Sequence, residues 1–499
     1  MISEWLHDPA GLAALVPAHF TIGAQTSAFQ VEGAVRDDGR EPSTWDIFMA
    51  QPGRISDDSY AAITADHYHR FGDDLRFMRE LGIDSYRFSL GWPRLQPAGR
   101  GAANRAAVAF YDRLLDGLLA VGIRPMLTLH HFDLPEPLQH VGGWLNRDTA
   151  SRLADFAYLA ATTFGDRVDS WVTLSEPVTA MIEGYAVGSH APGASLKMGA
   201  LAVVHNQLLG HGLAVEALRA ADVSGRIGIA NLHTPVEPSS DRREDVDQAE
   251  LFDLIHNRLY ADPILLGRYP DAPEETPDVF SLFREIEPSE LRTISQPLDF
   301  YGLSYSGPTR IRSSSAAGGL AATGLSVTGS RASGSPAARF SAPGFPFVAA
   351  PWPEFATTGD GTPDAPVFLA AALAELGARY GEALPPVVIT SVGASCADVV
   401  DVEGAINDEA RTAYLAEHLA VAFAATSAAI AAPGATGVSG STGAARVAVS
   451  GLYVRSLLDG WEWARGYETP YGLLHVNSRT QDRTPKRSYR WLQQLLGER

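Results

Sequence analysis

The stretch Ser85–His130 contains two short apolar runs, SYRFSL (Ser85–Leu90) and RPMLTLH (Arg124–His130), on either side of AVAFYDRLLDGLLAV (Ala107–Val121). The two runs have the length and composition of buried strands, whereas the segment between them carries apolar residues at helical spacing. A strand, a helix and a second strand in this order form one βαβ unit, whose two strands lie parallel.

The same alternation continues along the whole chain. Eight runs are predicted as strands: Phe20–Ala24, Ser85–Leu90, Arg124–His130, Ser170–Leu174, Arg226–Leu232, Asp299–Tyr305, Pro386–Thr390 and Val449–Val454. Longer segments with helical periodicity include Phe71–Leu81, Ala107–Val121, Thr149–Phe164, Ala200–Ala220 and Ala410–Ala425. Eight alternations predict an α/β fold, a single (β/α)8 TIM barrel with long βα loops that takes in residues 1–499 as one domain.

Length and composition agree with this prediction. The chain has 499 residues, about three times the usual length of one domain, but a (β/α)8 barrel with insertions reaches this size. Hydrophobic residues make up 45% and charged residues 19%, which is typical of a globular protein with a sizeable core. Two segments rich in Ser, Gly and Ala, 313–342 and 434–445, are predicted as loop insertions.

Charge and cysteine content limit the partners and the compartment. The formal charge of −19 would repel a phosphate backbone, so nucleic acid is not expected as a partner. No segment is apolar enough to span a bilayer, and the N-terminal residues lack the basic start of a secretory signal. The single cysteine, Cys396, excludes an internal disulfide. We expect a cytoplasmic protein that binds a small molecule, while its oligomeric state stays open.

Polar residues at the carboxyl ends of the predicted strands are the candidates for a functional site. In a (β/α)8 barrel the βα loops at these ends form one open face, where catalytic groups gather. The candidates are Gln30, Arg87, His130, His131, Ser175, Glu176, Asn231, Tyr305, Ser306, Ser391 and Arg455. Each of them alone is more simply explained as a residue of the barrel rim, and their joint position supports a site.

Ten motifs, which include eight of these eleven residues, give the chain a resemblance to family 1 glycoside hydrolases of the β-glucosidase type. They are TSAFQVEGA (Thr26–Ala34), YRFSLGWPRLQP (Tyr86–Pro97), TLHHFDLPEPL (Thr128–Leu138), GGWLNR (Gly142–Arg147), FGDRVDSWVTLSEP (Phe164–Pro177), GYAVGSHAPG (Gly184–Gly193), DPILLGRYP, DFYGLSYS, SLLDGWEWARGY and RTPKRSYRWL. They follow the family's order and spacing over nearly the whole chain.

The resemblance implies retaining hydrolysis of β-glycosides, which needs one carboxyl as acid/base and a second as nucleophile, about 5 to 5.5 Å apart. The acid/base motif, usually Thr-x-Asn-Glu-Pro, is Thr173–Pro177 here and gives Glu176 that role. The nucleophile motif, usually Ile-Thr-Glu-Asn-Gly, is Ile389–Gly393, with Ser391 in place of the glutamate. A neutral serine hydroxyl is a poor nucleophile without an adjacent base, so ordinary retaining hydrolysis is expected to be absent or very weak.

Other positions of the implied site are changed or kept. Ser175 replaces the asparagine that usually touches the sugar, Ser306 a tyrosine that usually bonds the nucleophile, and Arg455 a tryptophan. The residues expected to bind the sugar ring or its hydroxyls are Gln30, His131, Glu462 and Trp463, and Phe132 keeps an aromatic wall. An alternative is that these four are relics that pack but bind nothing, because a fold does not secure a function.

Losing a glutamate at position 391 and gaining Arg455 makes the predicted pocket more positive and leaves Arg87 without its usual partner. An anion from the substrate or the buffer, or Asp398 or Asp459 reaching in, would restore the balance. The alternative is that Arg455 pairs with Glu462 or points out of the barrel. In that case the pocket has no unbalanced positive charge and no place for an anion. Both alternatives remain open, and so does the protonation state of Glu176, since burial and Arg455 act on it in opposite directions.

Three functions follow from these residues. The first is acid-assisted chemistry at an acetal or oxocarbenium-like centre, in which Glu176 donates the proton and the substrate, water or an external anion supplies the nucleophile. The second is a non-catalytic pseudo-glycosidase that binds a glycoside or an anionic ligand. The third is an ordinary β-glycosidase with a relocated nucleophile. Cys396 is a further nucleophile to consider, although a buried inert cysteine is the simpler interpretation. No cofactor or metal is implied.

Overall fold

The computed structural model describes residues 4–272, 278–314, 345–427 and 447–499. Of the two predicted loop insertions, residues 315–342 of the first and all of 434–445 lie outside the described residues. No helix within the described ranges is long and apolar enough to cross a membrane.

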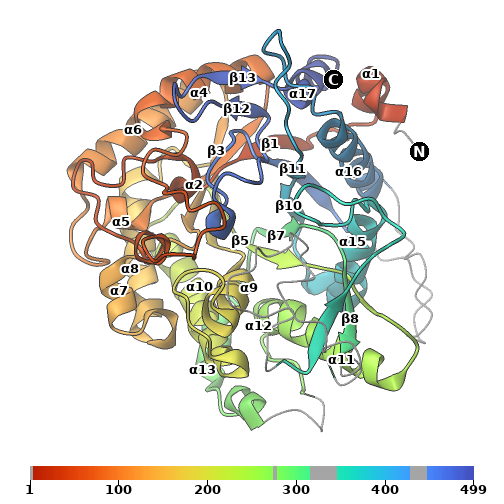
Figure 1. The fold of residues 1–499 in the computed structure, drawn as a ribbon. Coiled ribbons are helices and arrows are strands. Elements are labelled where there is room, and N and C mark those ends of the chain that lie inside the picture. Colours follow the sequence, from red (N-terminus) through yellow and green to blue (C-terminus); the bar gives the residue numbers. More distant parts are fainter. Residues whose placement is uncertain (1–3, 273–277, 315–344, 428–446) are drawn as a thin grey trace.

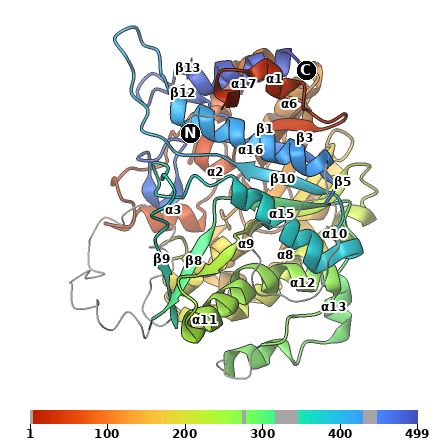
Figure 2. The same cartoon turned by 90° about the vertical axis from the view of Figure 1, so that its right-hand side faces the viewer.

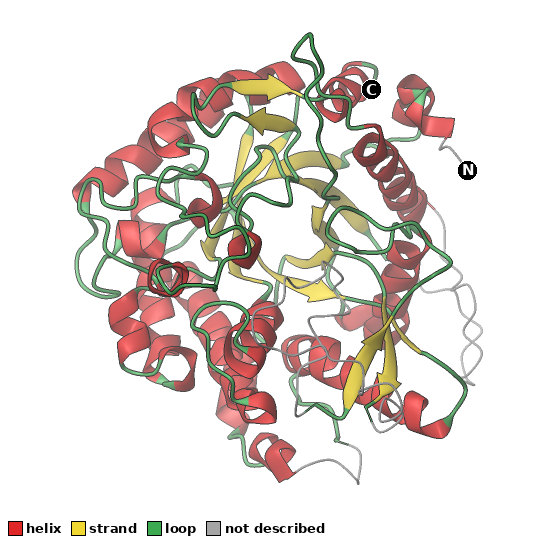
Figure 3. Ribbon diagram, in the orientation of Figure 1, coloured by secondary structure: helices red, strands yellow, loops and turns green. Residues whose placement is uncertain are grey.

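Eight parallel strands close into a barrel at the centre of the molecule (Figures 1 and 3). They are β1 (Thr21–Gln25), β2 (Ser85–Ser89), β3 (Arg124–His130), β4 (Ser170–Ser175), β5 (Arg226–His233), β7 (Phe300–Tyr305), β10 (Val387–Val392) and β11 (Val449–Arg455). Each strand pairs with its neighbours in chain order, and β11 closes the ring against β1. The predicted α/β class and (β/α)8 barrel are confirmed.

Helices surround the barrel and bury the outer faces of the strands. The long ones are α4 (His67–Leu81), α6 (Arg105–Ala120), α8 (Asp148–Phe164), α10 (Ala202–Ala220), α15 (Val367–Tyr380) and α16 (Glu409–Ser427). Shorter ones are α1 (Pro9–Ala13), α3 (Thr44–Met49), α11 (Arg243–Asp253), α12 (Leu259–Leu266), α13 (Pro288–Ile294) and α17 (Arg487–Gly497). Helices α1 and α17 lie side by side in both views, so the two chain ends meet on one side of the barrel (Figures 1 and 2).

The inside of the barrel is a packed core and not a channel. A cluster of six buried side chains from six different strands fills it: Met126, Val172, Ala230, Phe300, Val388 and Tyr453. Because the strands are buried on both faces, their sequences are nearly continuous apolar runs instead of alternating ones, which is why they were recognisable.

Two small sheets extend the loops on the carboxyl side of the barrel strands. Strands β6 (Val236–Pro238), β8 (Thr309–Ser313) and β9 (Phe347–Ala350) form one, and β12 (Leu474–Val476) pairs with β13 (Arg483–Pro485) in the other. Directly after β13, the fully buried Lys486 contacts Asp398 and Asp459, with 2.7 Å between Lys486 Nζ and Asp459 Oδ1. This cation ties the end of the chain to the loops that follow β10 and β11.

Candidate active site

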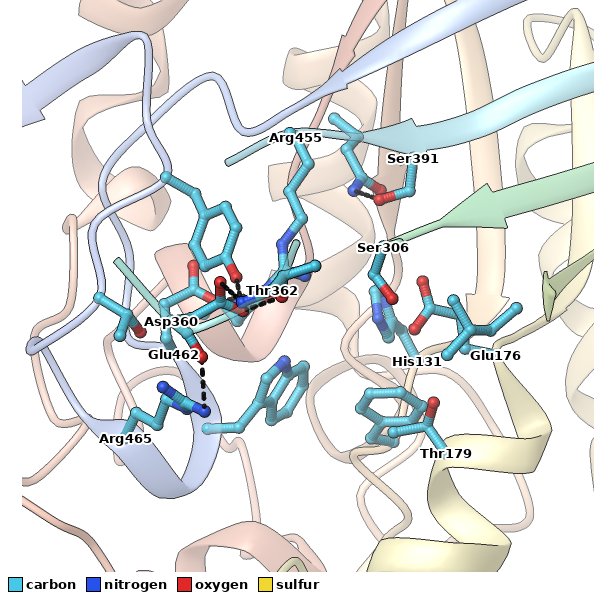
Figure 4. Close-up of a pocket in the computed structure, with 18 of the residues that line it drawn as sticks. His131, Glu176, Thr179, Ser306, Asp360, Thr362, Ser391, Arg455, Glu462 and Arg465 are labelled. Atoms are coloured by element: carbon cyan, nitrogen blue, oxygen red, sulfur yellow. Dashed lines mark hydrogen bonds and ion pairs between the residues drawn. The ribbon is translucent and has the colours of Figure 1, made fainter. Parts of the chain in front are cut away.

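A pocket opens where the carboxyl ends of β1, β4, β7, β10 and β11 converge. The space between its lining atoms is about 960 Å³ including the open mouth. The lining residues are Gln25, Gln30, His131, Phe132, Glu176, Thr179, His190, Leu232, Tyr305, Ser306, Asp360, Thr362, Ser391, Gly393, Arg455, Glu462, Trp463, Arg465, Thr469 and Tyr471. Figure 4 shows Glu176, His131 and Ser306 on one side of this pocket and Asp360, Glu462 and Arg465 on the other.

Glu176 follows the last residue of β4 and turns the chain into a helix. Its backbone is left-handed, with φ 48° and ψ 53°, and Pro177 then begins the short helix α9 (Pro177–Thr179). A left-handed conformation is uncommon for a residue other than glycine and tends to persist at functional sites. No described residue donates a hydrogen bond to the Glu176 carboxyl group, which leaves that group available to a ligand.

The pocket is closed on the Ser391 side by Gln25, the last residue of β1. Gln25 Nε2 donates a hydrogen bond to Ser391 Oγ at 2.8 Å, and Gln25 Oε1 accepts one from Arg87 Nη1 at 2.9 Å. All three side chains are buried. One neutral amide therefore joins Arg87 to Ser391.

Arg87 is surrounded by neutral acceptors. Besides Gln25, it donates to Thr128 Oγ1 at 3.1 Å, to Thr390 O at 3.1 Å and to Ser175 Oγ at 2.8 Å. Burial lowers the pKa of Arg87 to about 10, and the charge of Glu176 opposes that change. Among the described residues no carboxylate hydrogen-bonds Arg87, and its four hydrogen-bond partners are all uncharged groups.

Arg455 reaches into the pocket from the end of β11 and pairs with Glu462, with 2.7 Å between Nη2 and Oε2. Its guanidinium also lies 3.9 Å from the ring centre of Tyr471. Burial lowers the pKa of Arg455, but the charges of Tyr471, Glu462 and Glu176 outweigh it and the net shift is upward. Of the two alternatives left open by the sequence, the Arg455–Glu462 pair is the one observed.

The carboxylates proposed as fillers of the pocket lie elsewhere. Asp398 and Asp459 pair with Lys486, and Asp398 also pairs with Arg411. The expectation that one of them reaches in beside Arg87 is wrong, because these buried cations outside the pocket already bind both.

Aromatic side chains form the wall beside Glu462. Phe132 and Trp463 lie with ring centres 5.0 Å apart and planes at 60°, and His131 is 5.7 Å from Trp463. Phe132 and Trp463 share the left-handed backbone of Glu176, with φ 73° and 54°. Burial, then the charges of Arg87, His130 and Arg455, hold the pKa of His131 well below its usual value, so its imidazole is neutral.

The remaining predicted residues divide into two groups. Gln30, Tyr305 and Ser306 line the pocket, whereas Arg87, Ser175 and Asn231 are not among its lining residues. Asn231 instead donates to the Tyr301 hydroxyl at 2.9 Å. Tyr305 is also committed within the protein, since its hydroxyl donates to Ala365 O at 3.0 Å.

Several lining residues were not predicted from the sequence. Asp360 and Thr362 come from the loop between β9 and α15, and His190 from the loop after β4. Asp360 accepts from the Tyr471 hydroxyl at 2.7 Å and from Thr362 Oγ1 at 3.0 Å. Gln25 also lines the pocket and was not predicted. Its position was recognisable from the sequence, because it is a polar residue at the carboxyl end of the first predicted strand.

Metal ligands and the thiol of Cys396 are the other groups that could carry chemistry. Within the described ranges no group of three or more His, Cys, Asp or Glu side chains is placed to hold a metal ion. Cys396 does not line the pocket, and burial raises the pKa of its thiol to about 11, which disfavours the reactive thiolate.

The (β/α)8 barrel has an available carboxyl group after β4 and an aromatic wall built from the loops after β3 and β11, an arrangement compatible with the binding of a sugar. The model of glycosyl hydrolase family 1 matches residues 12–499, and the chain belongs to this family.

Similar proteins cover nearly the full length of the chain. β-Glucosidase A of Acetivibrio thermocellus is 34% identical over 480 residues, which are 96% of this chain and 98% of that protein. Among solved structures, a psychrophilic β-glucosidase from Micrococcus antarcticus is 35% identical with a TM-score of 0.83, covering 96% of this chain and 97% of that one. Virulence factor SghA from Agrobacterium tumefaciens, solved with its substrate analog salicin, is 34% identical with a TM-score of 0.84 over 98% of each chain.

Proposed function

We propose that this chain is a divergent family 1 protein without a retaining nucleophile, in which Glu176 donates a proton at an acetal or glycosidic centre. The observation that carries the proposal is the difference between the two sides of the pocket. The Glu176 carboxyl group is available to a ligand, whereas the side of Ser391 and Gln25 holds a hydroxyl and an amide. The other two carboxyl groups among the described lining residues, Asp360 and Glu462, are already hydrogen-bonded.

With this arrangement the bond to the leaving oxygen breaks as Glu176 protonates it, and the nucleophile comes from the substrate itself, from water or from a dissolved anion. Attack by a second group of the substrate gives cyclisation, attack by another hydroxyl gives transfer, and attack by water gives hydrolysis. The small-molecule substrate carries a glycosidic or other acetal centre.

The test compares the natural protein with Glu176→Gln and Ser391→Ala on a panel of β-glucosides, following both the rate and the anomeric configuration of the product. We expect Glu176→Gln to abolish turnover and Ser391→Ala to change it little. Equal loss in both variants would contradict the proposal and indicate a serine-based mechanism.

A second function, non-catalytic binding, is favoured by the state of Glu462. Its carboxyl group already accepts a hydrogen bond from Arg455 at 2.7 Å, so one of the groups expected to hold sugar hydroxyls is already bound within the protein. Saturable binding of a glycoside without product, unchanged in Glu176→Gln, would favour this function over the first.

A further inference from the structure

The amide of Gln25 occupies a position that suits a small anion. It lies between a cation, Arg87, and a hydroxyl, Ser391, and forms one hydrogen bond with each. A carboxylate in the same place would accept a hydrogen bond from both. The carbon, oxygen and nitrogen of the amide equal in number the three heavy atoms of formate, so exchanging one for the other changes charge more than shape.

The charge of Arg87 makes this position attractive to an anion. The side chain is 1% exposed, and all its hydrogen-bond partners among the described residues are neutral. A buried cation loses hydration that neutral acceptors restore only in part, and a hydrogen-bonded anion would restore it more fully. Glu176 acts on Arg87 only as a charge, without a hydrogen bond.

We propose that Gln25 is a neutral plug in a small-anion site, and that shortening its side chain lets formate bind between Arg87 and Ser391. This inference deepens the proposed function. The binding of formate does not depend on that function, whereas the turnover experiment rests on it. Of the three nucleophile sources named in the proposed function, the plug leaves the substrate and water for the natural protein, because the amide of Gln25 takes the place of a dissolved anion.

Binding is tested first, without any substrate. The variants Gln25→Ala and Gln25→Ser open the space to different degrees, so one failure to fold does not end the test. Thr128→Val is the matched control, because it removes another hydrogen bond of Arg87 without opening the pocket. The probe is sodium formate, whose single proton is observed by saturation-transfer NMR against a sodium chloride background of equal ionic strength.

We expect saturable formate binding in both Gln25 variants, at least about tenfold tighter than in the natural protein and in Thr128→Val. Three results would overturn the proposal: equal binding in the natural protein, equal binding in Thr128→Val, or no binding in either folded Gln25 variant.

Turnover then separates this inference from the proposed function. With a dinitrophenyl β-glucoside, a formate oxygen bonds to the anomeric carbon while the bond to the dinitrophenolate breaks, giving an α-glucosyl formate. Formate-dependent release of dinitrophenolate by Gln25→Ala supports the plug and a working glycoside site, whereas the proton transfer from Glu176 is tested with a leaving group that needs a proton. If formate binds to Gln25→Ala but no dinitrophenolate is released, the role of Gln25 as a plug is supported and a working glycoside site is contradicted. Release by the natural protein that rises equally with formate contradicts the plug alone.

Discussion

Glu176 and Arg455 enter the pocket from two strand ends and have opposite relations to their surroundings. The carboxyl group of Glu176 has no hydrogen-bond donor among the described residues, whereas Arg455 is held by Glu462 and by the ring of Tyr471. The first is free to exchange a proton with a ligand. The second is fixed, and its role is to neutralise a buried carboxylate.

The proposed role of Glu176 as proton donor predicts that the effect of its removal depends on the leaving group. A methoxide leaving group needs a proton, while dinitrophenolate departs as an anion. Glu176→Gln should therefore slow any turnover of a methyl β-glucoside by about 10²- to 10⁴-fold and that of a dinitrophenyl β-glucoside much less. Steady-state rates of both substrates in both proteins measure this. A uniform loss for the two would argue that Glu176 only binds the substrate.

Breaking the Arg455–Glu462 pair should destabilise the protein in a pH-dependent way. Burial raises the pKa of Glu462 above its usual value of 4.5 even beside Arg455. In Arg455→Leu that carboxyl group lacks its cation, so the folded state loses stability as the pH rises through the raised pKa. Urea unfolding should show a loss of about 3 kcal/mol near pH 7 and less near pH 4.5. The double variant Arg455→Leu/Glu462→Gln should recover much of it, and a pH-independent loss would contradict this account.

At the scale of elements, the strands form the barrel, and the loops after them supply most of the residues that line the pocket. The predicted run Arg124–His130 coincides with β3, and Ser170–Leu174 is one residue shorter than β4. Such runs were predictable because a strand buried on both faces must be apolar. Asp360 and Tyr471 were not, since loop conformation rests on contacts between distant segments that leave no local pattern.

Gln25 and Arg455 show how far the sequence reaches into the site. Both lie at strand ends, so their presence near the pocket follows from the barrel. Their hydrogen-bond partners depend on distances across the barrel, and the pattern of apolar residues in the sequence does not predict these distances. For this reason the sequence predicts the Arg455–Glu462 pair only as one of two alternatives. It does not predict the hydrogen bond between Gln25 and Ser391.

The loop before α15 contains a carboxyl group that lowers stability at neutral pH. Burial, aided by Glu417, raises the pKa of Asp364 from 3.8 to about 6. A raised folded-state pKa means that stability is lost as the pH rises from about 3.8 through 6. Asp364→Asn should therefore raise the free energy of unfolding at pH 7.5 by on the order of 1 kcal/mol and have little effect at pH 4. Urea titrations at both values test this, and an equal gain at both would exclude titration as the cause.

At the scale of the whole molecule, Lys486 joins segments that are far apart in the sequence. It lies between the loop after β10 and the loop after β11, and precedes α17, which packs on α1 near the other end of the chain. The barrel is thus closed by its strands and also held by a buried charge that connects its last segment to two of its loops.

Removing that charge should lower stability strongly. Lys486→Met leaves Asp459 without its buried cation and Asp398 with Arg411 only, and we expect a loss of about 3 to 5 kcal/mol in the free energy of unfolding. The chain has one other lysine, the exposed Lys197, and Lys197→Met is the matched control with an expected change below about 0.5 kcal/mol. Thermal and urea unfolding of the three proteins compare them. Similar losses in both variants would contradict the assigned role of Lys486.

The bridge from Gln25 to Ser391 also limits which single substitutions this site can accept. A glutamate introduced at position 391 alone would meet an amide that already fills the space beside Arg87, so that single mutation gains little for selection to act on. Shortening Gln25 alone would leave Arg87 with one acceptor fewer. A carboxylate at position 391 therefore fits beside Arg87 only when both residues change together, so the effects of the two substitutions are epistatic.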